Sequence, residues 1–125
     1  MANTFKVTTG SSIATTVGHN TATIYTVPGS TTSIILSLLL SNKTTVAIKT
    51  SVQLISTTSN SGNNNNRSSG ANETAHIIKD VQIDEETSLE IMSGQKYVMQ
   101  TGDSIKVFGA AADIDVVLSY MEITA

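Results

Sequence analysis

Apolar and polar side chains alternate with a period of two along much of this chain, and this pattern limits the possible folds more than any other feature. The alternation is strongest over residues 45–56, where Val46, Ile48, Val52 and Leu54 are separated by polar or small residues. A period of two places apolar side chains on one face of a β-strand, whereas an amphipathic helix needs a spacing of three to four. No stretch of ten or more residues has helical spacing. The sequence therefore predicts an all-β fold.

Further strands are predicted where the alternation returns between turn residues. Turn signals such as Pro28-Gly29, Ser93-Gly94 and Gly102-Asp103 recur about every eight to twelve residues, a spacing typical of sandwiches and jelly rolls. The predicted strands are 3–8, 21–27, 33–41, 45–56, 74–83, 88–92, 96–100, 104–108 and 114–124, with 11–16 as a weak further candidate. We predict a single antiparallel β-sandwich or jelly-roll-like domain of eight or nine short strands over residues 1–125.

The predicted strand 33–41 and residues 116–123 of the predicted strand 114–124 are apolar on both faces. A strand of this kind is covered on both sides, so we expect one sheet face to pack against another subunit instead of water. We also expect 33–41 and 45–56 to form a long hairpin at the centre of one sheet, with a tight turn at 42–44.

Two segments are predicted to contact neighbouring molecules. Residues 57–72 are almost entirely Ser, Asn, Gly and Thr, so they cannot offset their ordering entropy by burial and are expected to form a long exposed loop. The alternative for this loop is that it orders against a neighbour. Residues 1–16 form a possible N-terminal arm that could add a strand to a neighbour's sheet edge. The predicted contact residues are Phe5, Val7, Ile13, Asn63, Asn64, Asn65, Asn66, Arg67, Val117, Met121 and Ile123.

The sequence lacks the residue patterns of catalysis and of metal or cofactor binding. It contains no cysteine, which excludes disulfides, thiolate metal sites and thiol catalysis. His19 and His76 have no local partners at the spacing that a metal or a catalytic pair requires. We predict no catalytic residues, no cofactor and no metal, and therefore no enzyme.

Charge and hydropathy exclude further classes of partner. The net charge is −3 and the seven basic residues are scattered, which argues against nucleic-acid binding. The acidic run at 84–86, with Asp80 before it, lacks the alternation of a calcium loop, so we expect a solvated turn. Asp113 and Asp115 are expected to be charged residues at the start of a strand, where they can oppose unwanted edge pairing. No signal peptide or apolar run long enough for a membrane span is present, so we expect no membrane contact and a cytoplasmic place of synthesis.

Three stretches, TIYTVPGSTTSIILSLLLSN, SLEIMSGQKYVMQTGDSIKV and DVVLSYMEIT, share their order and motifs with a known class of proteins. They resemble small β-sandwich virion proteins of tailed bacteriophages, especially the contractile-tailed phages of marine cyanobacteria. The resemblance covers roughly two thirds of the chain, and residues 57–72 form a longer connection than in those proteins.

This resemblance implies a structural virion component, present in repeated copies or as a homo-oligomer. Its partners would be major capsid, tail or neck proteins, and its place would be on the capsid, neck, tail or baseplate. A receptor- or glycan-binding module on a fibre is the alternative, although the sequence has no Trp and few aromatic residues to form a sugar platform.

Overall fold

The computed structural model describes residues 2–13, 22–57, 73–109 and 114–124. Several predicted features lie outside these residues. They are the turn at 18–20 with His19, the greater part of the 57–72 loop, the connection through 110–113, and the contact residues Asn63, Asn64, Asn65, Asn66 and Arg67.

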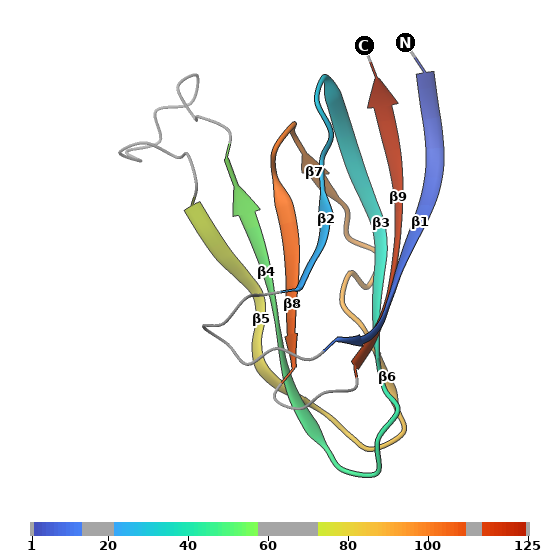
Figure 1. The fold of residues 1–125 in the computed structure, drawn as a ribbon, viewed down its shortest axis with the longest axis vertical. Coiled ribbons are helices and arrows are strands. Elements are labelled where there is room, and N and C mark those ends of the chain that lie inside the picture. Colours follow the sequence, from blue (N-terminus) through green and yellow to red (C-terminus); the bar gives the residue numbers. More distant parts are fainter. Residues whose placement is uncertain (1, 14–21, 58–72, 110–113, 125) are drawn as a thin grey trace.

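The described residues form nine strands and no helix, arranged as two packed antiparallel sheets (Figure 1). The first sheet, here the β1 sheet, consists of β1 (Ala2–Ile13), β9 (Ile114–Thr124), β3 (Thr31–Asn42), and β6 (Ser88–Glu90) with β7 (Tyr97–Met99). The second, the β2 sheet, has the order β2 (Ala22–Thr26), β8 (Ser104–Gly109), β4 (Ile48–Ser56), β5 (Glu73–Ile83). The predicted fold class, an antiparallel β-sandwich of eight or nine strands, is confirmed.

The strands pair in a nested order. β1 pairs with β9, β2 with β8, and β4 with β5, while β6 and β7 both pair with β3. Because β6 and β7 continue one another along β3, they act as a single interrupted strand, and each sheet then contains four strands. The chain crosses between the sheets at every connection except β4–β5 and β6–β7, which is the winding of a jelly roll.

The predicted hairpin between 33–41 and 45–56 is wrong. β3 pairs with β9, β6 and β7, whereas β4 pairs with β5 and β8 in the other sheet. The connection at 43–47 is thus a crossover between the sheets and not a hairpin turn. The three strands within 88–107 also do not pair with one another, because β6 and β7 pair with β3 and β8 lies in the β2 sheet. Alternation identifies strands, but it carries no information about which strand is the neighbour.

Asn42, at the end of β3, holds this crossover in place. Its side chain is buried, and its Nδ2 donates to the carbonyl oxygens of Val46 at 2.8 Å, Ile83 at 3.0 Å and Asp84 at 3.2 Å. Its Oδ1 accepts from the backbone N–H of Thr44 at 2.9 Å and from the Thr44 hydroxyl at 2.7 Å. One amide therefore joins the β3–β4 crossover to the end of β5, and it bonds backbone groups of Thr44, Val46 and Asp84, which lie outside the strands.

The core fills the space between the sheets. Residues on the inner faces alternate with outer ones along each strand, as the burial of every second residue over most of β9 shows. The largest fully buried side chains are Ile35, Leu38, Leu40, Ile48, Met92, Met99, Ile105, Ile114, Leu118, Val52, Val107 and Val116.

We expect Asn42→Asp to destabilise the fold strongly, because the variant sets a carboxylate oxygen against three carbonyl oxygens without a donor. The free energy of unfolding should fall by about 2 kcal/mol or more, as for buried groups that lose their partners. Urea denaturation measures the change. Ser41→Ala is the control, since Ser41 is a half-buried neighbour whose hydroxyl bonds to the Ser88 hydroxyl at the surface. Equal stability of the two variants would contradict the role assigned to Asn42.

Candidate interaction surface

A row of four apolar side chains crosses the outer face of the β1 sheet. Phe5 on β1 lies opposite Met121 on β9, Met121 lies opposite Ile34 on β3, and Ile34 lies opposite Val98 on β7. Directly opposed residues in antiparallel strands project from the same face, so the four side chains form one continuous line. Phe5 is 73% exposed and Val98 is 61% exposed, while Met121 and Ile34 are half-buried between them.

Further apolar residues flank this row on the same face. Ile123 lies opposite Asn3 and Thr32 on one side of it. On the other side are Val7, 61% exposed, and the opposed pair of Val117 and Leu39. We call this surface the apolar face, which consists of Phe5, Val7, Ile34, Leu39, Val98, Val117, Met121 and Ile123.

The apolar face contains every predicted contact residue whose side chain the structure describes. Phe5, Val7, Val117, Met121 and Ile123 are brought together there, although they come from the two ends of the chain. Ile13 ends β1 with its backbone paired to Ile114. The segment predicted as an arm is therefore largely a strand of the chain's own sheet, since Ala2–Ile13 pairs with β9.

Ile34, Leu39 and Val98 belong to the apolar face but were not among the predicted contact residues. The two-sided apolar pattern of 33–41 was a signal for Ile34 and Leu39. Val98 has no such signal, because one valine in a three-residue strand shows no period.

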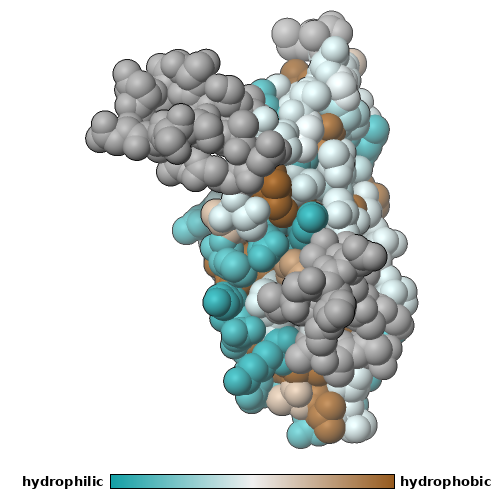
Figure 2. All heavy atoms as spheres, turned by 60° about the vertical axis from the view of Figure 1, so that its left-hand side comes forward, coloured by the Kyte–Doolittle hydropathy of each residue, from teal (hydrophilic) through white to brown (hydrophobic). Residues whose placement is uncertain are grey.

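The outer face of the β2 sheet is different in character. The corresponding row across its four strands is polar: Thr23 lies opposite Lys106, Lys106 opposite Gln53, and Gln53 opposite His76. Figure 2, which brings the β5 side of the molecule forward, shows hydrophilic residues gathered over that side. The same face of the β2 sheet also carries Phe108 and Ile55, so the contrast lies between the two central rows, one apolar and the other polar.

A buried charged group lies behind the apolar face and ties β1 to its neighbours. Glu122 on β9 is only 5% exposed; its Oε1 accepts from the Lys6 ammonium at 2.7 Å, and its Oε2 accepts from the Tyr25 hydroxyl at 2.6 Å. The Tyr25 hydroxyl also bonds with the Ser33 hydroxyl. The centroids of the Tyr25 and Tyr120 rings lie 4.3 Å apart. The cluster joins β1, β9 and β3 to β2, across both sheets.

These contacts shift the protonation equilibria of the cluster. The hydrogen bond from Lys6, together with that from Tyr25, holds the pKa of Glu122 below its ordinary value despite burial. Burial raises the pKa of Tyr25, and its bond to Glu122 raises it further. The bond to Glu122 likewise raises the pKa of Lys6. Both carboxylate oxygens already accept hydrogen bonds, so the arrangement supports a structural role for Glu122.

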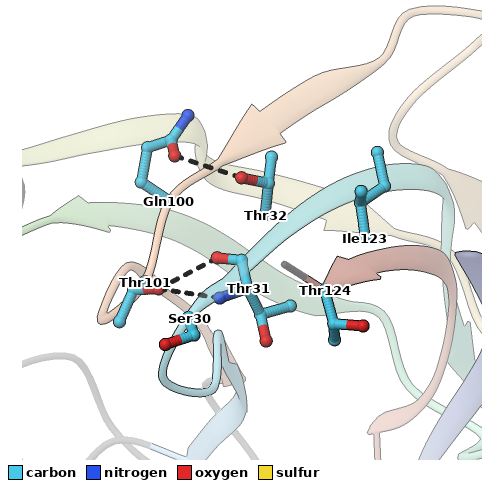
Figure 3. A pocket seen from close by; sticks show the side chains of 7 residues that line it. All are labelled: Ser30, Thr31, Thr32, Gln100, Thr101, Ile123 and Thr124. Atoms are coloured by element: carbon cyan, nitrogen blue, oxygen red, sulfur yellow. Dashed lines mark hydrogen bonds between the residues drawn. The ribbon is translucent and has the colours of Figure 1, made fainter. Parts of the chain in front are cut away.

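An open hollow of about 400 Å³ borders the apolar face where β3 begins and β9 ends (Figure 3). Its polar groups bond to one another. The Thr101 hydroxyl accepts from the Thr31 N–H at 3.1 Å and donates to the Thr31 carbonyl at 3.0 Å, while the Thr32 hydroxyl donates to Gln100 Oε1 at 3.3 Å. These bonds continue the β3–β7 pairing through side chains. The described residues of the lining include no charged or aromatic side chain that could bind a ligand.

The other residues considered from the sequence form no site within the described part of the chain. There, no group of three or more His, Cys, Asp or Glu side chains could hold a metal ion, and no helix could span a membrane. His76 bonds to Gln53 at 3.1 Å, and Asp115 pairs with Lys43 at 3.0 Å. Tyr25 and Tyr120 are in the core and cannot serve as a sugar platform.

Comparison of the chain with protein-family models, with curated proteins and with solved structures finds no match. The resemblance to virion proteins thus stays a prediction. The class that the fold defines is the jelly-roll β-sandwich, and within the described residues its most distinctive surface is the apolar face.

The Glu122 cluster predicts a dependence of stability on pH. Because the folded-state pKa of Glu122 is lowered, its contribution is complete above the unfolded-state pKa of about 4.3 and is lost as the pH falls through the folded-state value. Glu122→Gln should therefore lose less stability than the wild type between neutral pH and about pH 3. Urea denaturation at several pH values in this range measures how the free energy of unfolding changes with pH. Glu85→Gln, in an exposed turn, should keep the wild-type slope, and the same slope in all three proteins would contradict the assignment.

Proposed function

We propose that this protein is a non-enzymatic structural component of a phage virion, acting as a capsid decoration protein or as a neck, tail or baseplate accessory. It works through protein–protein contacts made in many copies. The observation that carries the proposal is the apolar face, with an uncharged row across four strands of the β1 sheet, where the corresponding row of the β2 sheet is polar.

The exposure of the apolar face supports a protein partner. Phe5, Val7 and Val98 each leave more than half of their surface in water in the isolated chain. Covering apolar surface yields about 25 cal/mol for each Å² removed from water, and contiguous apolar patches mark interaction sites. A partner that covers this face would stabilise both the contact and the fold.

The shape of the face favours a large partner over a small ligand. Small-molecule sites are concave and enclose most of their ligand, whereas the apolar face lies on the outer side of a sheet. A surface of this kind suits another protein. Contacts that are weak one by one become strong when many copies bind a repeating particle, because avidity multiplies them.

The fold is compatible with this role. Jelly rolls form many viral capsid domains, but they also form lectins and cupins, so the architecture alone is an analogy. The resemblance in 23–42, 88–107 and 115–124 points to the same class of virion proteins.

The test uses native particles and a charge placed in the apolar face. Val98→Lys should keep the fold, because its side chain is exposed, and should bind particles that lack the protein at least about tenfold more weakly than the wild type, as expected for a residue in an interface core. Co-sedimentation with particles measures binding, and electron microscopy should place the wild-type protein at symmetric positions.

The matched control is Thr23→Lys, an exposed position on the outer face of the β2 sheet. This variant should bind particles like the wild type. If Val98→Lys binds as well as Thr23→Lys, or if the wild-type protein is absent from particles, the proposed function is wrong.

A further inference from the structure

β1 is a long, regular strand at the edge of its sheet. From Ala2 to Gly10 it pairs with β9 without a register shift. Among the described strands, none pairs with its other edge. The outward backbone N–H and C=O groups along these residues can therefore accept an additional strand.

The other three sheet edges of the described strands carry features that oppose such pairing. β5 has register shifts against β4, a left-handed backbone at Asp80 (φ 52°), and the charged residue Lys79 beside it. β2 has five residues with a shift at Ile24, and Pro28 follows it closely. The fourth edge is divided between β6 and β7, which have three residues each. Short length, bulges, charges and proline are the devices by which proteins protect sheet edges.

Over its regular part, β1 carries only one of these devices, a charged residue. It contains no proline, and its single charged residue is Lys6. The ammonium of Lys6 is held by Glu122, 2.7 Å away on the inner side of the sheet. The outer side of β1 presents Phe5 and Val7, both strongly exposed, with no charge between them.

From these observations we propose that β1 pairs with β1 of a second copy of this chain, antiparallel and around a two-fold axis that passes through Val7. The two β1 sheets then form one continuous sheet, and their apolar faces become one surface. The inference goes beyond the proposed function, because the dimer requires only this chain and no particle.

The residues of β1 fit a second copy, and they favour this register over one centred on Lys6. A two-fold axis perpendicular to the sheet keeps both outer faces on one side and sets Val7 against its own copy. Phe5 then lies opposite Thr9 of the second copy, and Lys6 lies opposite Thr8. Centring the axis on Lys6 would instead set two ammonium groups opposite each other, which is unfavourable.

The dimer closes by itself. Each copy has one unprotected edge, and a two-fold contact uses that edge in both copies. Edge pairing therefore stops at a dimer. If both edges of the sheet were unprotected, further copies could add at each end without limit.

Sedimentation velocity of the purified full chain tests the proposal, at concentrations up to roughly 0.1 mM. The wild type should sediment as a dimer. Val7→Lys places a charge on the axis and should sediment as a folded monomer, with an unchanged circular dichroism spectrum. The matched control is Val98→Lys: Val98 is also a valine on the apolar face, with the same exposure of 61%, but it lies on β7, away from the β1 edge. This variant should remain a dimer.

Crosslinking gives a second, independent readout, because the chain has no cysteine of its own. Oxidised Val7→Cys should form a disulfide-linked dimer, since the two Cβ atoms meet at the axis. Val98→Cys should remain uncrosslinked under the same conditions.

Three outcomes would overturn the proposal: a monomeric wild type, a dimeric Val7→Lys, or no disulfide from Val7→Cys. A monomeric wild type would also make a strand from another protein the better occupant of the β1 edge. These outcomes leave the proposed function in place, because that function is tested by particle binding of Val98→Lys. Conversely, failure to bind particles does not affect the dimer.

Discussion

The antiparallel ladder between β3 and β9 is the constraint on which both the core and the apolar face depend. The two strands pair along their whole lengths, from Thr31 opposite Thr124 to Asn42 opposite Ile114. The register shifts by one residue between Ile35 and Ser37. Because side chains alternate between the faces of a sheet, the register on each side of this shift decides which residues face the core and which face outward. It places Leu38 opposite Leu118 on the inner side and Ile34 opposite Met121 on the outer side. A slip of one residue would exchange the core for the exposed surface.

The Glu122 cluster determines how β1 joins this ladder. Removing a carboxylate from water costs several kcal/mol, and only close partners offset that cost. Lys6 and Tyr25 supply these partners from two other strands, so the cluster is satisfied in one arrangement of β1, β9 and β2. The same arrangement brings Phe5 from the start of the chain beside Met121 near its end. A buried polar contact on the inner side thus positions an apolar surface on the outer side.

Much of the fold follows from the alternation in the sequence, and the parts that do not follow share a physical cause. The predicted strands lie close to those observed, and the turns at Ser93-Gly94 and Gly102-Asp103 occur where glycines adopt positive φ angles. The predicted hairpin fails because the bonds of Asn42 reach Ile83, 41 residues away, and no local pattern records such a contact. Val98 joins the apolar face through its register with Ile34, which is equally invisible in its own short strand.

The sequence by itself determined that this chain forms strands, that they enclose one core, and that two of them carry more apolar surface than one core requires. These are local properties, because the period of two acts within each strand. Only the tertiary structure decided which strands are neighbours and which sheet presents the excess apolar residues. Pairing joins residues far apart in the chain, and its energy depends on how the sheets pack as a whole. The apolar face and the β1 edge therefore emerge only once the jelly roll has formed.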